Sequence, residues 1–488
     1  MTIVIERLSL RRRPLLKVLM LVVWLGASAQ VLWAEGNEHP TADLLSELIR
    51  IDTSNPPGNE DKIAEFLSSR LRPLGFEIQI VPTPAPGQSH LIARLKGDGT
   101  KKPVLIAAHA DVVGVEREKW TVDPFSGIVR DGYVYGRGAI DFKGGLAVFT
   151  EAVMQLARNH VPLHRDVILL SEADEEGGPY NTTWLANSHW DLISCEFALN
   201  EGGWIMKNTA GQVQYVSVST ADKFSIPVVV TATGTSTHSS MPTPDNAIYA
   251  LARALDRLSE YETPLELIPS TREFFQTLSK VSQPPLSKNL DILLNSKDPA
   301  QVREADRQVS ENPLLHALMR NTLAPVLLKA GFRGNVIPGS AQATINVRLI
   351  PNTDFDGLLS HMRQVINDPH VEVSLASPDT PDGQRAVALL KLRSSLSPST
   401  KDTVLYRALQ ASAHSIWPDA PVTPYLFQAG TDAGAWRSRG VPVYGIYPYP
   451  ITAGDLRRMH GNDERVSIHS LEQGTKLIYK MLVQVESE

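Results

Sequence analysis

The sequence of 488 residues predicts a large α/β domain that is interrupted by a smaller, ferredoxin-like α+β domain. Apolar strand patterns and amphipathic helix patterns alternate through the first part of the chain, which is typical of an α/β layer structure. The pattern then changes to β-α-β-β-α-β, and strand and helix signals of the first type resume near the C-terminus. We therefore expect residues 36–221 and 386–488 to form the large domain, with residues 222–380 inserted between them.

Hydrophobic periodicity predicts the elements of the first part of the large domain. Helical periodicity runs through residues 41–75, and Gly75 stands where a C-terminal cap is expected. Residues 143–160 are expected to form an amphipathic helix, because their apolar side chains recur on one face. Short apolar runs predict strands at Glu77–Pro82, Leu91–Leu95, Val104–Ala108, Asp166–Ser171 and Glu196–Asn200.

The inserted domain is predicted mainly from one strictly alternating segment. Residues 340–350 alternate between apolar and polar side chains, which is typical of a strand with one buried face. A mostly helical insertion is expected at residues 262–330, where the apolar side chains favour packing between helices over a binding groove. The other expected elements are strands at 224–231, near 334–338 and at 370–375, and helices at 245–261 and 354–367. In the second part of the large domain, Val441–Tyr447 is expected to be a central strand.

Composition and charge exclude several classes of protein. A chain that is 42% hydrophobic and 20% charged is globular rather than disordered or fibrous. The single cysteine, Cys195, excludes an intrachain disulfide and any multi-cysteine metal site, so a bound metal would need His, Asp and Glu ligands. The net charge of −6 and the lack of a basic tract in the body of the chain argue against nucleic acid as a partner.

Residues 1–29 resemble a secretory signal peptide. They carry five basic residues and one acidic residue, and the apolar run Leu15–Gly26 precedes Ala27-Ser28-Ala29. An uncleaved membrane anchor is the alternative, although the apolar run is shorter than a bilayer span. No later stretch approaches ~18 consecutive apolar residues. We therefore expect an exported protein, periplasmic or extracellular, without a membrane span after processing.

Histidine and acidic residues follow the ends of several predicted strands. In open α/β sheets ligands bind beyond the carboxyl ends of the strands, so these side chains are expected to converge. Each signal alone is weak, since an adjacent acidic pair is usually solvated and an acidic residue beside glycines can cap a helix. Together they provide histidine and carboxylate ligands without cysteine, which suits a dinuclear zinc or cobalt hydrolase. The residues are His109, Asp111, Asp141, Glu175, Glu176, Glu201 and His460.

These residues occur in motifs that resemble, in order, those of a zinc exopeptidase family. The family includes aminoacylase, acetylornithine deacetylase, succinyl-diaminopimelate desuccinylase and glutamate carboxypeptidase. The chain is most similar to its branch of carboxypeptidase S and secreted N-acyl-amino-acid hydrolases. The motifs are His109-x-Asp111, Gly136-Arg137-Gly138-x-x-Asp141-x-Lys143-Gly144-Gly145, Asp174-Glu175-Glu176, Asn200-Glu201-Gly202-Gly203 and His460.

The resemblance implies two zinc ions per chain, for which cobalt is a substitute. It implies that His109 and Glu201 bind one ion, that Glu176 and His460 bind the other, and that Asp141 bridges both. Some members of the family have Asp at the position of Glu201, so this side chain would reach the metal through one more methylene group.

The resemblance also assigns the groups around the metals. Asp111 would accept a hydrogen bond from the far nitrogen of His109, and Glu175 would be the general base. A cis peptide bond is expected between Asp141 and Phe142. The inserted domain would act as a lid and as the dimerisation domain.

Five further residues are expected to bind the substrate. The resemblance implies that His238 stabilises the oxyanion across the interface of a homodimer. Arg348 is expected to bind a substrate carboxylate, with a hydrogen bond from Asn335. The resemblance implies that backbone amides at Gly430 and Thr431 meet the same carboxylate. A small molecule or short peptide with a free carboxylate is therefore the expected partner.

The resulting prediction is a dinuclear zinc metallohydrolase of the metallocarboxypeptidase or aminoacylase type. It would cleave the amide bond of N-acyl-amino acids or release the C-terminal residue of small peptides. An aminopeptidase or dipeptidase is an alternative, which would need an acidic group for a free substrate amine. A metal-free binding protein on the same fold is another, and the same residues would also serve N-acyl-amino-acid synthesis.

Overall fold

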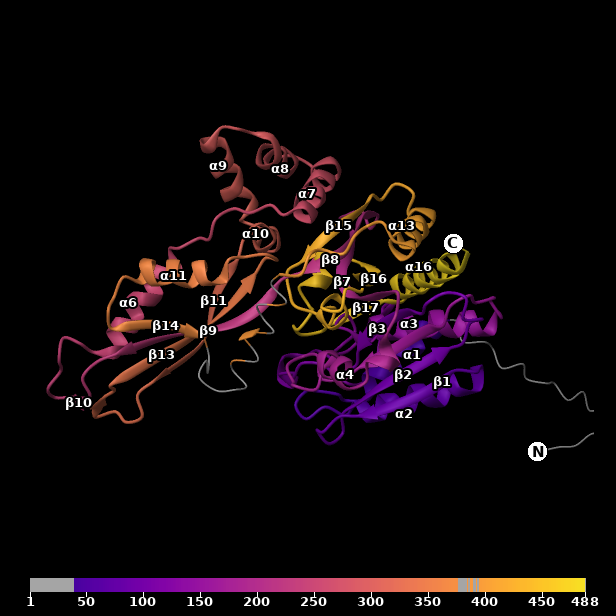
Figure 1. The fold of residues 1–488 in the computed structure, drawn as a ribbon, viewed down its shortest axis with the longest axis horizontal. Coiled ribbons are helices and arrows are strands. Elements are labelled where there is room, and N and C mark those ends of the chain that lie inside the picture. The colour runs from indigo at the N-terminus through magenta and orange to yellow at the C-terminus, as the bar shows by residue number, and fades with distance from the viewer. Residues whose placement is uncertain (1–38, 376–383, 385–386, 389–391, 393–394, 488) are drawn as a thin grey trace, which may run out of the picture. The chain divides into compact units, whose positions relative to one another are not determined.

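The computed structural model describes residues 39–487, apart from 376–383, 385–386, 389–391 and 393–394. The predicted signal peptide and the expected end of the inserted domain lie outside the described residues. Within the described ranges, no helix combines the length and apolar character needed to cross a membrane. The two largest sheets have eight and four strands (Figure 1).

The eight-stranded sheet belongs to the predicted large domain. Its order is β1 (Glu77–Pro82), β2 (Ser89–Leu95), β6 (Val167–Glu172), β3 (Val104–His109), β7 (Phe197–Lys207), β16 (Val443–Ile451), β8 (Val213–Asp222) and β15 (Val422–Phe427). The neighbours β6, β3, β7 and β16 are parallel, so their carboxyl ends lie at the same edge. All five strands predicted in the first part of the domain are confirmed, and β16 is a central strand as expected.

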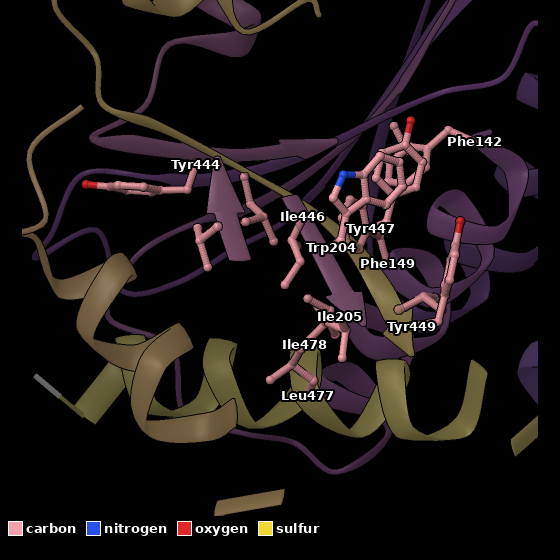
Figure 2. Close-up of a cluster of buried hydrophobic side chains, with 14 of the residues drawn as sticks. Phe142, Phe149, Trp204, Ile205, Tyr444, Ile446, Tyr447, Tyr449, Leu477 and Ile478 are labelled. Carbon is pink, nitrogen blue, oxygen red and sulfur yellow. The ribbon is translucent and has the colours of Figure 1, made fainter. Parts of the chain in front are cut away.

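Both faces of the inner strands of this sheet are buried, which explains the continuous apolar runs of β3 and β6. Ile106 of β3 belongs to a core cluster with side chains of α3 (Lys143–Arg158) and α16 (Ile468–Ser487). The adjacent Leu105 belongs to a second cluster, on the other face. Figure 2 shows part of the first cluster, where residues of α16 lie below those of β7 and β16.

Several helices and short strands complete the large domain. The predicted helical segment at 41–75 consists of two helices, and Gly75 caps it with a φ of 89° in the left-handed region. The helices are α1 (Pro40–Arg50), α2 (Glu60–Leu71), α4 (Thr182–Ser188), α5 (Trp190–Ile193), α13 (Val404–Ile416), α14 (Gly434–Arg437) and α15 (Ala453–Leu456). A three-stranded sheet contains β4 (Val129–Arg130), β5 (Tyr133–Tyr135) and β17 (Arg465–Ser467).

The four-stranded sheet has the predicted ferredoxin-like topology. Its order is β11 (Thr322–Ala330), β13 (Ser340–Leu349), β9 (Phe224–Thr233) and β14 (Val371–Leu375), and every pair is antiparallel. Its core contains apolar side chains of α6 (Ala247–Ser259) and α11 (Phe355–Ile366). The alternation along β13 is confirmed, since its apolar face is buried in that core and Arg348 lies on the other face.

The second strand of this unit was wrongly expected near 334–338. The helical insertion ends at Met319 rather than at residue 330, and β11 follows it. Because β11 is an edge strand whose side chains are mostly exposed, its sequence shows no alternation. Residues Val336–Ile337 form β12, which pairs with β10 (Thr237–His238).

The helical insertion packs against the large domain. Its helices are α7 (Pro269–Val281), α8 (Leu286–Asn295), α9 (Pro299–Val309) and α10 (Pro313–Met319). Helix α7 contacts β8 and β15, and Phe274 and Phe275 are buried in the first core cluster. The expectation that these apolar side chains pack between elements is confirmed.

Candidate metal centre

The predicted ligands meet beyond the carboxyl ends of the parallel strands. His109 ends β3, Glu176 follows β6, and Glu201 lies in β7. Asp141 immediately precedes Phe142, the N-cap residue of α3, and His460 lies in the loop before β17. The parallel arrangement of the strands therefore brings residues from distant parts of the chain to the carboxyl edge of the large sheet.

One half of the cluster contains His109, Asp141 and Glu201. His109 Nε2 lies 3.1 Å from Asp141 Oδ1 and 3.5 Å from Glu201 Oε2. The other ring nitrogen, Nδ1, lies 2.9 Å from the backbone carbonyl oxygen of Asp111. A proton on Nδ1 satisfies that contact and leaves the Nε2 lone pair directed toward the carboxylates, as metal ligation requires.

The other half contains His460, Glu176 and the second oxygen of Asp141. His460 Nε2 lies 3.0 Å from Asp141 Oδ2 and 3.2 Å from Glu176 Oε1. Asp141 therefore directs one oxygen toward each half of the cluster, which is the arrangement that a bridging carboxylate needs. The expected cis peptide between Asp141 and Phe142 is present.

Asp111 contacts His109 in a different way from the one predicted. Its carboxylate Oδ1 lies 3.6 Å from His109 Nδ1, so the backbone oxygen rather than the carboxylate accepts the hydrogen bond. The carboxylate instead accepts hydrogen bonds from the backbone amides of Glu175 and Glu176, at 3.2 and 3.0 Å, and from Asn55 Nδ2 at 2.9 Å. Asp111 thus holds the loop that carries both glutamates.

A buried ion pair connects the loops of Asp141 and His460. Arg137 Nη1 lies 2.6 Å from Glu464 Oε2, and Arg137 Nη2 donates to the backbone oxygen of His460 at 3.2 Å. Glu464 Oε1 accepts hydrogen bonds from the backbone amides of Ile140 and Asp141 at 2.7 and 3.1 Å. The sequence gives no signal for this pair, because its members are 327 residues apart.

The hydroxyl of Tyr447 also supports the cluster, because it contacts the carboxylates of Asp141 and Glu201. Burial, and then the neighbouring charges of Asp141 and Glu201, raise its pKa well above the ordinary value, so the hydroxyl keeps its proton. It donates a hydrogen bond toward Asp141 Oδ1 and Glu201 Oε2. The sequence predicted only that Tyr447 belongs to a central strand.

Electrostatics show that this cluster suits cations. Burial raises the pKa of Glu201 to about 7, and burial with the nearby charge of Glu201 raises the pKa of Glu175 well above its ordinary value. Hydrogen bonds to Asp141 and Glu176 raise the pKa of His460 to about 10. Concentrated negative charge therefore favours bound protons here, and divalent ions would compensate the same charge.

The donor set also fits metal ions. One donor atom each from His109, Asp141 and Glu176 lies within 4.8 Å of the others, and so does one each from His109, Glu175 and Glu201. Imidazole nitrogens and carboxylate oxygens without thiolates are ligands for zinc and similar divalent ions. Donor atoms of the predicted ligands and of the predicted base therefore lie close enough to one another to bind the same metal ion.

A cavity of about 560 Å³ opens from the cluster and contains three of the predicted substrate-binding residues, Arg348, Gly430 and Thr431. The backbone of Arg348 pairs within the sheet, whereas its guanidinium makes no hydrogen bond or ion pair with another residue that the structure describes. The hydroxyl of Thr431 donates to Asp222 Oδ2 at 2.7 Å, so this hydroxyl proton is already used within the protein.

His238 and Asn335 do not line this cavity. His238 ends β10 and Asn335 immediately precedes β12, and the Ser239 amide donates to the Asn335 carbonyl oxygen at 3.0 Å. Both residues are exposed. The structure of one chain therefore brings the metal cluster and Arg348 to a common cavity and leaves these two residues outside it.

The fold and the site together define the chain as a metal-dependent hydrolase. Residues 105–484 match the family model described as Peptidase family M20/M25/M40, and the chain belongs to this family. It is 29% identical over 409 residues to the human N-fatty-acyl-amino acid synthase/hydrolase PM20D1, covering 82% of this chain and 77% of that protein. It is 31% identical over 407 residues to the probable carboxypeptidase S-like 2 of Dictyostelium discoideum, covering 81% and 74%.

Solved structures confirm the fold. An M20 family metallo-carboxypeptidase from Sulfolobus solfataricus superposes with a TM-score of 0.66 at 18% identity, covering 92% of this chain and 99% of that one. Human carnosine dipeptidase 1 gives a TM-score of 0.62 at 18% identity, with coverages of 92% and 96%. A dinuclear metal-binding M20 peptidase of Bacillus subtilis gives 0.55 at 13% identity, with coverages of 92% and 98%.

Proposed function

We propose that this chain is a dinuclear zinc amidohydrolase that acts on N-acyl-amino acids, or on the C-terminal bond of small peptides. The observation that carries the proposal is Arg348, an unpaired guanidinium that lines the same cavity as the metal cluster. Its planar fork suits a substrate carboxylate, which it would bind through two hydrogen bonds. The substrate amide would then lie between Arg348 and the cluster.

The chain's own residues divide the work of hydrolysis. Two zinc ions would be held by two pairs of ligands and one shared ligand, with cobalt as a substitute. The pairs are His109 with Glu201 and Glu176 with His460, and Asp141 is shared. When bound, such ions supply Lewis acidity toward the amide carbonyl and lower the pKa of the attacking water. Glu175 takes the proton of that water and returns it to the departing nitrogen.

The charges of the cavity favour a blocked substrate nitrogen over a free amine. Among the described residues, two acidic side chains line the cavity outside the cluster. Asp222 is paired with Arg437 at 2.6 Å, and Asp432 accepts a hydrogen bond from the backbone amide of Thr182 at 3.3 Å. Because both carboxylates already have partners, a substrate ammonium would compete with existing contacts. This supports the N-acyl-amino acid hydrolase over the aminopeptidase alternative.

A hydrolysis screen tests this proposal. N-acetyl, N-formyl and long-chain N-acyl amino acids are assayed beside dipeptides with a free amine, with and without a chelator. We expect the acylated substrates to have a kcat/KM about tenfold or more above that of the dipeptides, and chelation to abolish both activities. Incubation of free fatty acid with amino acid measures the reverse reaction. A preference for free-amine dipeptides, or activity that survives complete removal of metal, would refute the proposal.

The inserted domain is proposed to act as a lid and to join two chains into a homodimer. Strand β11 is the edge of its sheet and exposes Val326, Leu327 and Leu328 by 56%, 66% and 71%, close to the exposed Phe332. An unpaired apolar edge of this kind favours pairing with another chain. Since His238 does not line the cavity of its own chain, a second copy would supply it.

Light scattering tests the dimer. We expect wild-type protein to have the mass of two chains, and Leu328→Lys to shift it to one chain with reduced activity, because a lysine on an edge strand opposes pairing. Ile128→Lys, at a 40% exposed residue of the large domain, is the matched control and should leave the mass unchanged. A monomeric wild type with full activity would exclude the role of His238 across an interface.

Export also belongs to the proposal. The basic and apolar pattern of residues 1–29 supports cleavage by a signal peptidase. The mature enzyme would then begin near residue 30 and act in the periplasm or outside the cell. N-terminal sequencing of secreted protein tests this, and an intact N-terminus in the membrane fraction would favour the uncleaved anchor.

A further inference from the structure

Tyr447 contacts only one half of the metal cluster. Its hydroxyl oxygen lies 3.0 Å from Asp141 Oδ1 and 3.1 Å from Glu201 Oε2. These are the same two oxygens that approach His109 Nε2. The oxygen of Asp141 that faces His460 is the other one, Oδ2. The tyrosine therefore contacts the ligand atoms of the His109 half and none of those that form the His460 half.

The tyrosine is held rigidly in this position. It lies in the central strand β16, beside β7, which carries both Glu201 and Trp204. The Trp204 ring stacks on it with a centroid distance of 4.3 Å, and the Phe142 ring meets its edge at 5.0 Å (Figure 2). The side chain is 1% exposed. Rotation of the phenol away from the carboxylates would require these rings to move.

The hydrogen-bonding capacity of a hydroxyl makes this contact sensitive to a bound cation. A phenol has one proton, so it donates to one carboxylate oxygen at a time. Its oxygen then faces the second carboxylate oxygen without a proton between them, and the two oxygens repel each other. When both carboxylates are ionised, a cation bound by them would offset that repulsion, because its positive charge attracts both oxygens. The contact would thus be more favourable when the His109 half is loaded.

We propose that Tyr447 is a positioning residue that strengthens metal binding in the His109–Glu201 half of the centre and leaves the His460–Glu176 half nearly unaffected. The proposal rests on the dinuclear function given above. Tyr447 would act through two ligands, because its hydroxyl would hold the orientation of Glu201 and of the Asp141 carboxylate, whose two oxygens face the two halves. Hydrogen-bond partners of ligands typically change metal affinity by about 10- to 100-fold.

Metal titration of Tyr447→Phe tests the assignment. Chelator-treated wild type and variant are titrated with zinc against a competing chromophoric chelator, and with cobalt monitored by its absorption spectrum. We expect two ions in each protein. In the variant, one dissociation constant should rise by at least about tenfold, while the other stays within about twofold. The phenyl ring keeps its packing, so the thermal unfolding temperature of the metal-free protein should change little.

Tyr444→Phe is the matched control. Tyr444 lies in the same strand, and its hydroxyl contacts Thr403 Oγ1 and the Thr400 carbonyl, both at 2.6 Å, rather than the cluster. Both dissociation constants should equal those of wild type. Unchanged binding in Tyr447→Phe, or equal weakening of both ions together with lower thermal stability, would overturn the assignment. Wild type that binds two ions would preserve the dinuclear function in that case, whereas wild type that binds none would overturn both.

Discussion

Replacement of Glu175 by glutamine is expected to lower kcat by about 10²-fold or more while both metal ions remain bound. The glutamate carboxylate lines the cavity and lies within 4.8 Å of donor atoms of His109 and Glu201, so in the proposed mechanism it would lie beside the attacking water. Glutamine has nearly the same shape but cannot take up a proton. The support that Glu175 gives to Asp111 comes from its backbone amide, so this hydrogen bond survives the substitution.

The measurement combines steady-state kinetics with metal analysis of the same preparation. KM should change little, because the carboxylate is assigned to proton transfer and not to binding of the substrate carboxylate. Glu65→Gln, at an exposed residue of α2, is the control and should retain full kcat. Full turnover in Glu175→Gln would exclude this glutamate as the base. Loss of metal in parallel with activity would instead identify it as a ligand.

Replacement of Arg348 by glutamine is expected to lower kcat/KM by about 10- to 100-fold for substrates with a free carboxylate. Hydrogen bonds to charged groups contribute about 1.5–3 kcal/mol each, and glutamine offers neither the charge nor the planar fork. The guanidinium makes no hydrogen bond or ion pair with a side chain that the structure describes, although the charge of Glu175 acts on it, so its removal breaks no direct buried contact. The loss should appear mainly in KM, with metal content unchanged.

A methyl ester of the same substrate distinguishes a loss of carboxylate recognition from a general loss of enzyme activity. Wild type should discriminate strongly against the ester, whereas Arg348→Gln should hydrolyse acid and ester with similar kcat/KM. Arg348→Lys should fall between them, because it keeps the charge and loses the bidentate geometry. Arg303→Gln, at an exposed residue of α9, is the control. If Arg348→Gln still prefers the acid as strongly as wild type does, another group binds the carboxylate.

Local sequence patterns were sufficient for most of the fold. Inner strands of the large sheet such as β3 and β6 are apolar over most of their length because both of their faces are buried, and β13 alternates because only one face is. The failure at β11 has the same physical basis. An edge strand whose side chains face solvent leaves no periodic signal, so its residues were assigned to the preceding helical insertion.

Patterns in the sequence were enough to predict that histidine and acidic residues gather at the carboxyl edge of the large sheet. The motifs of His109, Asp141, Glu175, Glu176, Glu201 and His460 each follow a strand or precede a helix whose local pattern is clear, and parallel topology then brings them to one edge. Strict alternation along residues 340–350 placed Arg348 on the polar face of β13. The strand and helix patterns behind these inferences are local in sequence.

The contacts by which these groups support one another depend on how distant segments of the chain pack. The division of the two Asp141 oxygens between His109 and His460, the Arg137–Glu464 pair and the Tyr447 hydroxyl all join residues that lie far apart in the chain. The register between β7 and β16 shifts on both sides of Ile446, so periodicity could not predict where Tyr447 points. Hydrophobic patterns report which side chains are buried, whereas the partner of a buried polar group depends on how distant segments pack.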